Sequence, residues 1–583
     1  MSPAPMESTM QRLNAIYTRE RECQDCHKCI RECPVKAIRV EDGSARVVPE
    51  LCIMCGNCVL ACPSSAKQVR DDLPVAKALL TSGRRVIASL APSFVAEFAG
   101  VPPARLIHAL KQLGFFAVSE TALGAQQVSA SVSSLMRSEP EQIWISSACP
   151  VIVDFIGKYR PECQSHVSPV LSPLLTHCRM LRAQYGDGIA IVFIGPCIAK
   201  KREAELHPEL LDVVLTFEDL DRWLSEENIQ LAELPETPDD RFQPERAEEG
   251  AFYPIEGGMI PGITNSREVD SSQFMSFSGI SNVEQAMKGI AQWHPEHSIF
   301  FEMTACAGSC VNGPKAARNT SVARRRFDIV NYAKPAAQLP RKPSLGIAQH
   351  YDASPVARNE YSGLQLQKAL RTVGKYSVED ELNCGGCGYD SCRDFAHALL
   401  DRDAERMMCA TYTRELAQKK ANALLQKMPS AVVVVDENLK IIECNLNFVH
   451  MFATDDGQSK DLEGSALSAV MPFCSLFRRV LESGEDIVSH DIRYQRSTLN
   501  TSIFTIEPHS VMCGIFQDIT APIVQKEQII GRARQVIQKN LKTTQQIAYL
   551  LGKNAADSEI ILNSIVRSFS PEEVEEDDAG EQR

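Results

Sequence analysis

Eight cysteines lie within residues 23–62 of a 583-residue chain that contains 21 cysteines in all. They form two copies of the pattern C-x2-C-x2-C-x3-C-P, which read C-Q-D-C-H-K-C-I-R-E-C-P at 23–34 and C-I-M-C-G-N-C-V-L-A-C-P at 52–63. Three thiolates on a tight turn can wrap the irons of a cubane, and in this spacing the fourth cysteine ligates the other cluster. We expect that fourth cysteine to open a helix that points away.

The pattern therefore predicts two [4Fe-4S] clusters in a ferredoxin-like domain over residues 1–74. The first ligand set is Cys23, Cys26, Cys29 and Cys62, and the second is Cys33, Cys52, Cys55 and Cys58. Two zinc ribbons are the alternative, but zinc would not require the prolines that follow each set. Two adjacent clusters perform no substrate chemistry of their own, so we interpret this domain as an electron-transfer domain.

The charge and hydropathy of the chain limit which classes of protein it can belong to. The formal net charge is 61 − 74 = −13, and such an acidic chain lacks the basic surface that non-specific nucleic-acid binding needs. We find no run of about 18 uncharged apolar residues, and the opening M-S-P-A-P-M-E-S-T-M-Q does not resemble a secretory signal. We expect a cytoplasmic protein with neither nucleic acid nor membrane as a partner, whose thiols stay reduced and bind metal.

Residues 75–345 alternate short apolar runs with helical stretches, which is typical of an α/β domain. The runs are R-V-I-A-S-L-A-P (85–92), Q-I-W-I-S-S-A-C-P (142–150), I-A-I-V-F-I-G-P-C (189–197) and S-I-F-F-E-M-T-A-C (298–306), and a helical stretch is expected over 204–224. Cysteines follow three of these runs, namely Cys149, Cys197, Cys306 and Cys310. Functional groups of α/β folds gather at strand ends, so these four thiolates could converge on one more cubane. A single cysteine is often only a small core residue.

The residues around these cysteines resemble a known family. S-S-A-C-P (146–150), G-P-C-I-A-K-K-R-E (195–203) and F-E-M-T-A-C-A-G-S-C-V-N-G (301–313) resemble, in this order, the three signature loops of the [FeFe]-hydrogenase large subunit. A-P-S (91–93) and E-T-A-L-G-A (120–125) are similar to the same family. The resemblance covers about residues 20–340, including the ferredoxin segment.

The resemblance implies a site and a reaction. Cys149, Cys197, Cys306 and Cys310 would hold a cubane, and the sulfur of Cys310 would bridge to a diiron unit bearing CO, CN⁻ and a dithiolate. Lys200 would donate a charge-assisted hydrogen bond to one cyanide, and Pro92 and Ser93 would face the other. The family interconverts H2 with protons and electrons and exchanges those electrons with a ferredoxin-type carrier.

Three departures from the family pattern affect the expected rate. Catalytic members carry a proton-relaying cysteine where this chain has Ala148, and two methionines of the family correspond to Gly195 and Thr304. A methyl group cannot relay a proton, which could cost on the order of 10²–10⁴ in rate. We expect a metal site that can assemble but turns over slowly. We also expect its pocket to be more loosely packed and more polar than the pocket of catalytic members.

A third set of cysteines lies in a segment over 362–422. Its spacing is Cys384-x2-Cys387-x4-Cys392-x16-Cys409, and a helix over 393–408 is expected to carry the chain to that fourth ligand. It resembles the small four-cysteine iron–sulfur domain of corrinoid proteins and some hydrogenase-like chains, and zinc is the alternative. We expect a [4Fe-4S] terminal on the opposite flank of the central domain from the ferredoxin segment.

The last third of the chain differs in character. Residues 423–522 resemble a PAS sensory domain, with two strands before Asn445, a helix after it and further strands near 487–493, 501–507 and 511–517. Residues 523–569 predict a helical signalling or dimerising segment that could join two chains, and 570–583 predict a disordered acidic tail.

Together these segments predict a multidomain α/β and α+β protein. Its most economical interpretation is a sensory [FeFe]-hydrogenase that reacts slowly with H2 and passes its redox state to a kinase or phosphatase in trans. Two alternatives are a catalytic ferredoxin-linked hydrogenase and a non-enzymatic iron–sulfur protein without the diiron unit.

Overall fold

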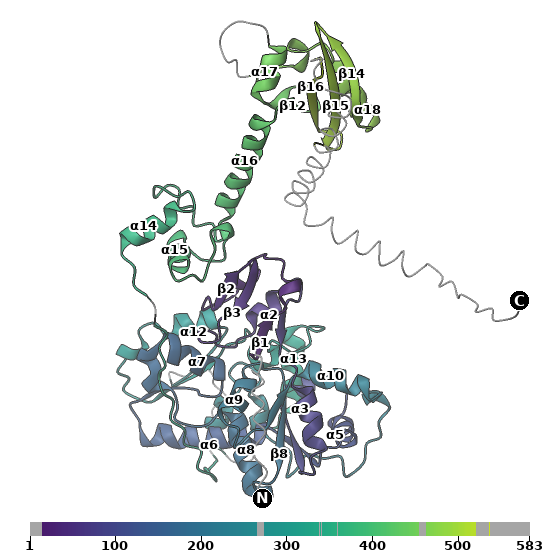
Figure 1. Ribbon diagram of the computed structural model, residues 1–583. Coiled ribbons are helices and arrows are strands. Elements are labelled where there is room, and N and C mark those ends of the chain that lie inside the picture. Colours follow the sequence, from purple (N-terminus) through teal and green to yellow (C-terminus); the bar gives the residue numbers. More distant parts are fainter. Residues whose placement is uncertain are drawn as a thin grey trace, which may run out of the picture. The chain divides into compact units, whose positions relative to one another are not determined.

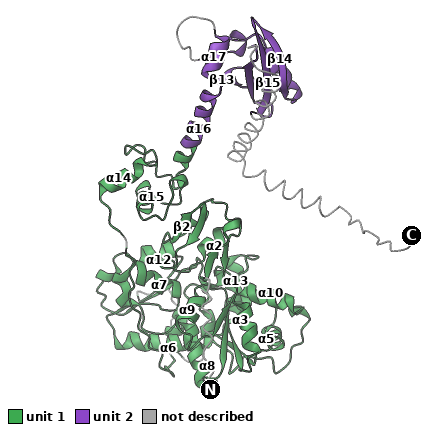
Figure 2. Ribbon diagram, in the orientation of Figure 1, with its two compact units in different colours: residues 1–414 green, residues 415–583 purple. Residues whose placement is uncertain are grey.

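The computed structural model describes residues 14–264, 273–336, 339, 341–357, 359–453, 462–520 and 536. The chain divides into two compact units, residues 1–414 and 415–583, which are coloured separately in Figure 2 and are described here one by one. The expected helical segment at 523–569, apart from Val536, and the acidic tail lie outside the described residues. No helix among the described residues is long and apolar enough to cross a membrane.

The ferredoxin segment contains two short antiparallel strand pairs and two short helices. β1 (Ile16–Thr18) pairs with β4 (Lys67–Val69), β2 (Ile38–Glu41) pairs with β3 (Ser44–Val47), and η1 (Glu20–Glu22), α1 (Lys28–Arg31) and α2 (Asn57–Ala61) complete it. The expectation that each fourth cysteine opens a helix is wrong. Cys33 and Cys62 come after α1 and α2, because the proline that follows each of them begins a turn.

The central domain is built on two parallel sheets. The first has the order β6-β5-β8-β9 and the second has the order β10-β11-β7. Their bounds are β5 (Val86–Leu90), β6 (Ala117–Glu120), β7 (Ile143–Ile145), β8 (Ala190–Ile194), β9 (Val213–Leu215), β10 (Phe274–Ser278) and β11 (Ile299–Thr304). The four apolar runs expected to be strands are confirmed as β5, β7, β8 and β11. Every residue of these four strands is buried, as is typical of parallel sheets covered on both faces.

Helices cover these sheets, as Figure 1 shows. They are α3 (Leu73–Leu80), α4 (Phe94–Glu97), α5 (Pro103–Gln112), α6 (Ala122–Ser138), α7 (Pro150–Tyr159), η2 (Pro161–His166), α8 (Pro173–Tyr185), α9 (Lys200–Leu206), α10 (Phe217–Glu226), η3 (Leu231–Glu233), η4 (Glu249–Phe252), α11 (Ile260–Ile263), α12 (Ile280–Ala286), η5 (Ile290–Gln292), η6 (Cys310–Asn312) and α13 (Val322–Tyr332).

The stretch over 204–224, expected to be helical throughout, contains a strand. α9 ends at Leu206, and Val213–Leu215 form β9, which pairs with β8 and is fully buried. Helix resumes after Thr216, whose side chain accepts a hydrogen bond from the backbone of Asp219 in a capping box. The stabilisation that Val213–Leu215 gain from pairing with the buried strand β8 exceeds the local preference for a helix.

The third cysteine segment is a small helical fold. It contains α14 (Gly363–Arg371), α15 (Cys392–Leu400) and η7 (Arg406–Met408), and the residues described before it, 333–336, 339, 341–357 and 359–362, form no helix. The single helix expected over 393–408 is only partly correct. α15 ends at Leu400, and a turn through Arg402, whose φ is +62°, separates it from the short 3-10 helix before Cys409.

The second unit is an antiparallel sheet with helices. α16 (Ala410–Lys427) leads into it, and the sheet has the order β13-β12-β16-β15-β14. Its bounds are β12 (Ala431–Val435), β13 (Ile441–Cys444), α17 (Leu446–Phe452), η8 (Leu467–Ala469), α18 (Cys474–Ser483), β14 (Ile487–Tyr494), β15 (Ser497–Glu507) and β16 (Val511–Asp518). The strands and the Asn445-capped helix expected from the sequence are confirmed. Phe448, Phe477 and Phe516 fill its core.

The packing of α6 against α8 leads to a test of the central domain. A methyl group on Gly124 of α6 would lie 2.7 Å from the backbone nitrogen of His177 in α8. We expect Gly124→Ala to destabilise the domain by about 1–3 kcal/mol, because the helices must separate. All three tryptophans lie in this domain, so guanidinium unfolding followed by tryptophan fluorescence measures it.

The matched control is Gly188→Ala. A methyl group at Gly188 meets nothing within 4 Å, so we expect a change within about 0.5 kcal/mol. Equal unfolding midpoints for the two variants would contradict the close helix approach.

Candidate metal centre

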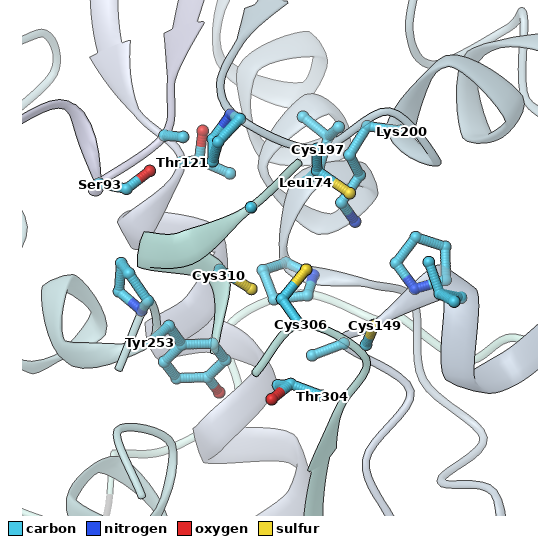
Figure 3. A pocket seen from close by; sticks show the side chains of 18 of the residues that line it. Ser93, Thr121, Cys149, Leu174, Cys197, Lys200, Tyr253, Thr304, Cys306 and Cys310 are labelled. Atoms are coloured by element: carbon cyan, nitrogen blue, oxygen red, sulfur yellow. The ribbon is translucent and has the colours of Figure 1, made fainter. Parts of the chain in front are cut away.

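A cavity lies where the loops after β7, β8 and β11 meet, and all four cysteines expected there line it. Cys149 follows β7, Cys197 follows β8, Cys306 follows β11, and Cys310 begins η6. Figure 3 shows the four side chains around the same space. Thiols that lie up to 161 positions apart in sequence, 310 − 149, are thus brought together at one place.

Burial dominates the electrostatics of these thiols. It raises the pKa of Cys197 to about 11 and that of Cys310 to about 12. Burial also raises the pKa of Cys149, and it raises that of Cys306 well above the ordinary value, with Cys310, Cys197 and Cys149 adding to the shift of Cys306. Four thiolates in so dry a place would repel one another, so their ionised forms need a compensating cation, which bound iron would supply.

Lys200 lines the same cavity and brings a positive charge to it. It is 8% exposed, and its Nζ donates to Glu203 Oε2 at 2.7 Å and to Ser172 Oγ at 3.2 Å. Burial lowers its pKa, but Glu203 and Cys197 raise it by more, so the net pKa lies above the ordinary value. Among the described residues these two bonds use two of its three N–H donors, which leaves one for an anionic ligand in the cavity.

The remaining residues singled out from the sequence also lie at this cavity. Pro92, Ser93, Ala148 and Thr304 line it. The expectation of looser packing is not met at Gly195, because a methyl group there would lie 2.6 Å from the Phe193 ring. The space that a side chain at 195 would occupy is filled by Phe193, which itself lines the cavity.

Several lining residues were not anticipated from the sequence. Tyr253 and Met259, from the segment before and into α11, line the cavity, and the Tyr253 hydroxyl bonds to Ser129 Oγ at 2.8 Å. Met54 and Cys55 of the ferredoxin segment line it too. No local spacing marks Tyr253 or Met259, since only the fold brings them to the strand ends.

The ferredoxin loop reaches the central cavity through a close backbone approach. Gly56 has φ +80°, and a methyl group on it would lie 2.5 Å from Pro314 and 2.9 Å from Ile198. The glycine of the motif C-G-N-C is the sequence signal that could have indicated this contact. A cluster bound by Cys55 would therefore lie directly beside the central site.

Within the ferredoxin segment the structure groups the thiols as the spacing predicts. Burial raises the pKa of Cys29 to about 11, and among its neighbours Cys23, Cys26 and Cys62 raise it further. Burial likewise raises the pKa of Cys58 well above the ordinary value, with Cys55, Cys33 and Cys52 adding to the shift. The two groups of four are the two predicted ligand sets, so each fourth cysteine lies with the opposite loop.

The third set of cysteines lines a cavity of its own, which contains Cys384, Cys387, Cys392 and Cys409. Its expected position on the opposite flank of the central domain is wrong. Gly388 packs on Ile30 of the ferredoxin segment, and Arg39 donates to Asp403 at 2.8 Å. The segment docks there because the two surfaces share one apolar core.

The donor sets fit iron–sulfur clusters. A mononuclear ion draws its ligands to within about 2.3 Å of one point, whereas a cubane distributes four thiolates over four irons. Among the described residues, no group of three or more His, Cys, Asp or Glu side chains is arranged as a single-ion site. The four-thiol cavities are instead apolar and thiol-rich, which suits soft metal clusters.

The sequence matches three known families. Residues 84–314 match the C-terminal domain of the iron only hydrogenase large subunit, residues 15–63 match a 4Fe-4S dicluster domain, and residues 380–411 match a family described as a putative Fe-S cluster.

The chain is similar to hydrogenases known from their sequences and to hydrogenases of solved structure. The periplasmic [Fe] hydrogenase large subunit of Nitratidesulfovibrio vulgaris is 25% identical over 366 residues, which is 52% of this chain and 86% of that protein. Iron hydrogenase 1 of Clostridium pasteurianum is 24% identical over 300 residues, 41% of this chain and 51% of that protein. An apo [FeFe]-hydrogenase HydA1 variant from Chlamydomonas reinhardtii has 20% identity, covers 49% of this chain and 100% of its own, and gives a TM-score of 0.39.

The family matches and the cysteine-lined cavities point to the same assignment. Residues 84–314 are similar to the [FeFe]-hydrogenase large subunit, with a match to a 4Fe-4S dicluster domain before that part and a match to a further iron–sulfur family after it.

Proposed function

We propose that this chain is a sensory [FeFe]-hydrogenase, which reacts slowly with H2 and passes its redox state to a signalling partner. The observation that supports this most is Ala148, on the wall of the cavity that also contains the four predicted ligand thiols and a buried lysine. The site is equipped to hold the metal centre but lacks the side chain that would move protons quickly.

The residues that would hold the centre have distinct roles. Cys149, Cys197, Cys306 and Cys310 would bind the cubane, Cys310 would be shared with the diiron unit, and Lys200 would donate to an anionic ligand. Pro92 and Ser93 would face that unit from the opposite loop. When bound, the diiron unit supplies the reversible splitting of H2 into protons and electrons.

The loop before Cys149 contains no substitute for the missing relay. The Ser146 hydroxyl donates to Met259 Sδ at 3.1 Å and accepts from the Ala148 amide at 3.2 Å. Ser147 donates to the Val170 carbonyl at 2.7 Å. Both hydroxyl protons of S-S-A-C-P are thus committed to protein partners, and Ala148 holds no exchangeable side-chain proton. Proton exchange through this loop would therefore have to use water, which supports a slow site.

Electrons have a route away from this site. Cys55 lines the central cavity, so the second ferredoxin cluster would accept electrons there, and a soluble ferredoxin-type carrier could exchange them with the first. Slow turnover combined with this route suits a protein that reports the presence of H2 through the oxidation level of its clusters.

The second unit is the proposed output module. Its five-stranded antiparallel sheet, with the two sequence-adjacent strands β12 and β13 at one side and β16 in the middle, supports a PAS-type assignment. Buried aromatic rings, including Phe448, Phe477 and Phe516, pack its interior, which favours transmission or dimerisation over ligand binding. A kinase or phosphatase acting in trans, at the surface of a homodimer, would receive the signal.

The sensing proposal predicts a spectroscopic result. In full-length protein matured with the diiron unit, we expect infrared bands from CO and CN⁻, and reduction of the iron–sulfur clusters under H2 detected by electron paramagnetic resonance. Cys310→Ala is the control, because it removes the proposed shared sulfur and should abolish both. If wild-type protein lacks the bands after maturation, the chain is an iron–sulfur protein without the diiron unit.

The role of position 148 predicts a gain of activity. We expect Ala148→Cys to raise H2 turnover with an artificial dye by up to about 10²–10⁴, because a thiol can release and take up a proton, which a methyl group cannot do. Ala148→Ser is the matched control, since a hydroxyl of similar size is a far weaker acid and should change the rate little. Fast turnover in the wild type, unchanged by Ala148→Cys, would favour a catalytic hydrogenase instead.

A further inference from the structure

The loop that carries the third set of cysteines lies close against the ferredoxin segment at Gly388. Gly388, next to Cys387, packs on Ile30, which lies between Cys29 and Cys33. A methyl group on Gly388 would lie 2.8 Å from Ile30 Cβ, and the φ of Gly388 is +95°. Both observations require glycine, so the backbone of the third loop packs directly on the side chain of Ile30 at this point.

Three basic side chains of the ferredoxin segment surround this contact. Arg31 donates to the Gly386 carbonyl at 3.3 Å and to the Cys26 carbonyl at 3.4 Å, which links the two cysteine loops. Lys36 donates to the Gly388 carbonyl at 2.9 Å and pairs with Asp390 at 3.3 Å.

The third, Arg39, donates to Asp403 at 2.8 Å, and the backbone amide of Val40 donates to the Asp403 carbonyl at 3.3 Å. Each of the three side chains donates at least one hydrogen bond from the ferredoxin segment to an acceptor in the third segment. Their shared polarity fixes the orientation of the third segment on the ferredoxin segment.

An apolar core continues beneath these bonds. Ile30 and Val40 of the ferredoxin segment belong to the same buried cluster as Tyr389, Phe395 and Met408 of the third segment. The two segments therefore share a hydrophobic core, which would hold the two iron–sulfur sites at a constant separation.

The third site is also joined directly to the helix that leads out of the first unit. Its last thiol, Cys409, immediately precedes α16, and its Sγ lies 3.2 Å from the Thr411 hydroxyl in the first turn of that helix. The second compact unit begins at Glu415, within α16. A change of charge at Cys409 would act on the start of this helix.

We propose that the third iron–sulfur site receives its electrons from the ferredoxin segment across the Gly388–Ile30 contact, and is the last redox group before the second unit. The inference rests on the proposed function for the presence of clusters. Each step moves one electron: a cluster of the ferredoxin segment is oxidised by one electron and the third site is reduced by one, with no bond made or broken. H2 at the central site, or dithionite in a test, is the reductant.

The test uses the full-length chain with its iron–sulfur clusters but without the diiron unit, reduced with dithionite. In wild-type protein we expect paramagnetic resonance to show spin coupling between the third cluster and the ferredoxin clusters, seen as a broadened, fast-relaxing signal. Gly388→Ala should weaken this coupling and slow the relaxation several-fold, because the added methyl group drives the loops apart.

Gly385→Ala is the matched control in the same loop. Its φ of +68° imposes similar backbone strain, but its methyl group would meet only the Tyr389 carbonyl, at 3.9 Å. We expect the coupling to be kept in this variant. Equal coupling in Gly388→Ala and Gly385→Ala, or a third cluster that is magnetically isolated in the wild type, would overturn the proposal.

A charge-reversal pair keeps the test decisive if Gly388→Ala fails to fold. Arg39→Glu should weaken the coupling, and Arg39→Glu combined with Asp403→Arg should restore it. Arg393→Glu, which breaks the Arg393–Glu381 pair inside the third segment, should leave it unchanged.

Two further outcomes separate this inference from the proposed function. Normal coupling in Arg39→Glu would overturn the inference, and so would a coupling that is lost in Arg39→Glu and is not restored in the double variant. Absence of iron at the third site by Mössbauer spectroscopy would overturn it along with that cluster assignment, whereas the diiron proposal is judged independently from its infrared bands.

Discussion

The burial of thiols at the ends of parallel strands is the constraint on which the rest of this molecule depends. Cys149, Cys197, Cys306 and Cys310 line one cavity, and burial raises the pKa of each. Thiolates there are stable only beside positive charge, so the cavity is suited to a metal cluster and disfavours ionised thiols alone. Lys200, held charged by Glu203, extends the same principle to an anionic ligand.

Glycines decide where the three cysteine-rich parts meet. Gly56 allows the ferredoxin segment to contact Pro314 and Ile198 beside the central cavity, and Gly388 allows the third segment to contact Ile30. Both positions have positive φ and too little room for a methyl group. The ferredoxin segment is consequently the junction between the other two sites, with the central cavity on one side and the third segment on the other.

The departures from the family pattern have different structural consequences. At position 148 the relaying side chain is absent, and the neighbouring hydroxyl groups of Ser146 and Ser147 bond elsewhere. At position 195 the loss is compensated, because Phe193 fills the space. The alanine at position 148 supports the proposed sensing role, in which the protein would report H2 without consuming much of it.

The sequence by itself determined the cysteine spacings, the four buried strand runs, the order of the segments and the family resemblance. These are local patterns, in which the thiol spacing or the run of apolar residues is itself the signal. Tertiary structure alone decided that β9 interrupts a helical stretch, that Tyr253 and Met259 line the cavity, and that the third segment docks on the ferredoxin segment rather than on the opposite flank. Each of these depends on pairing or packing between residues distant in the chain, and no local pattern records such partners.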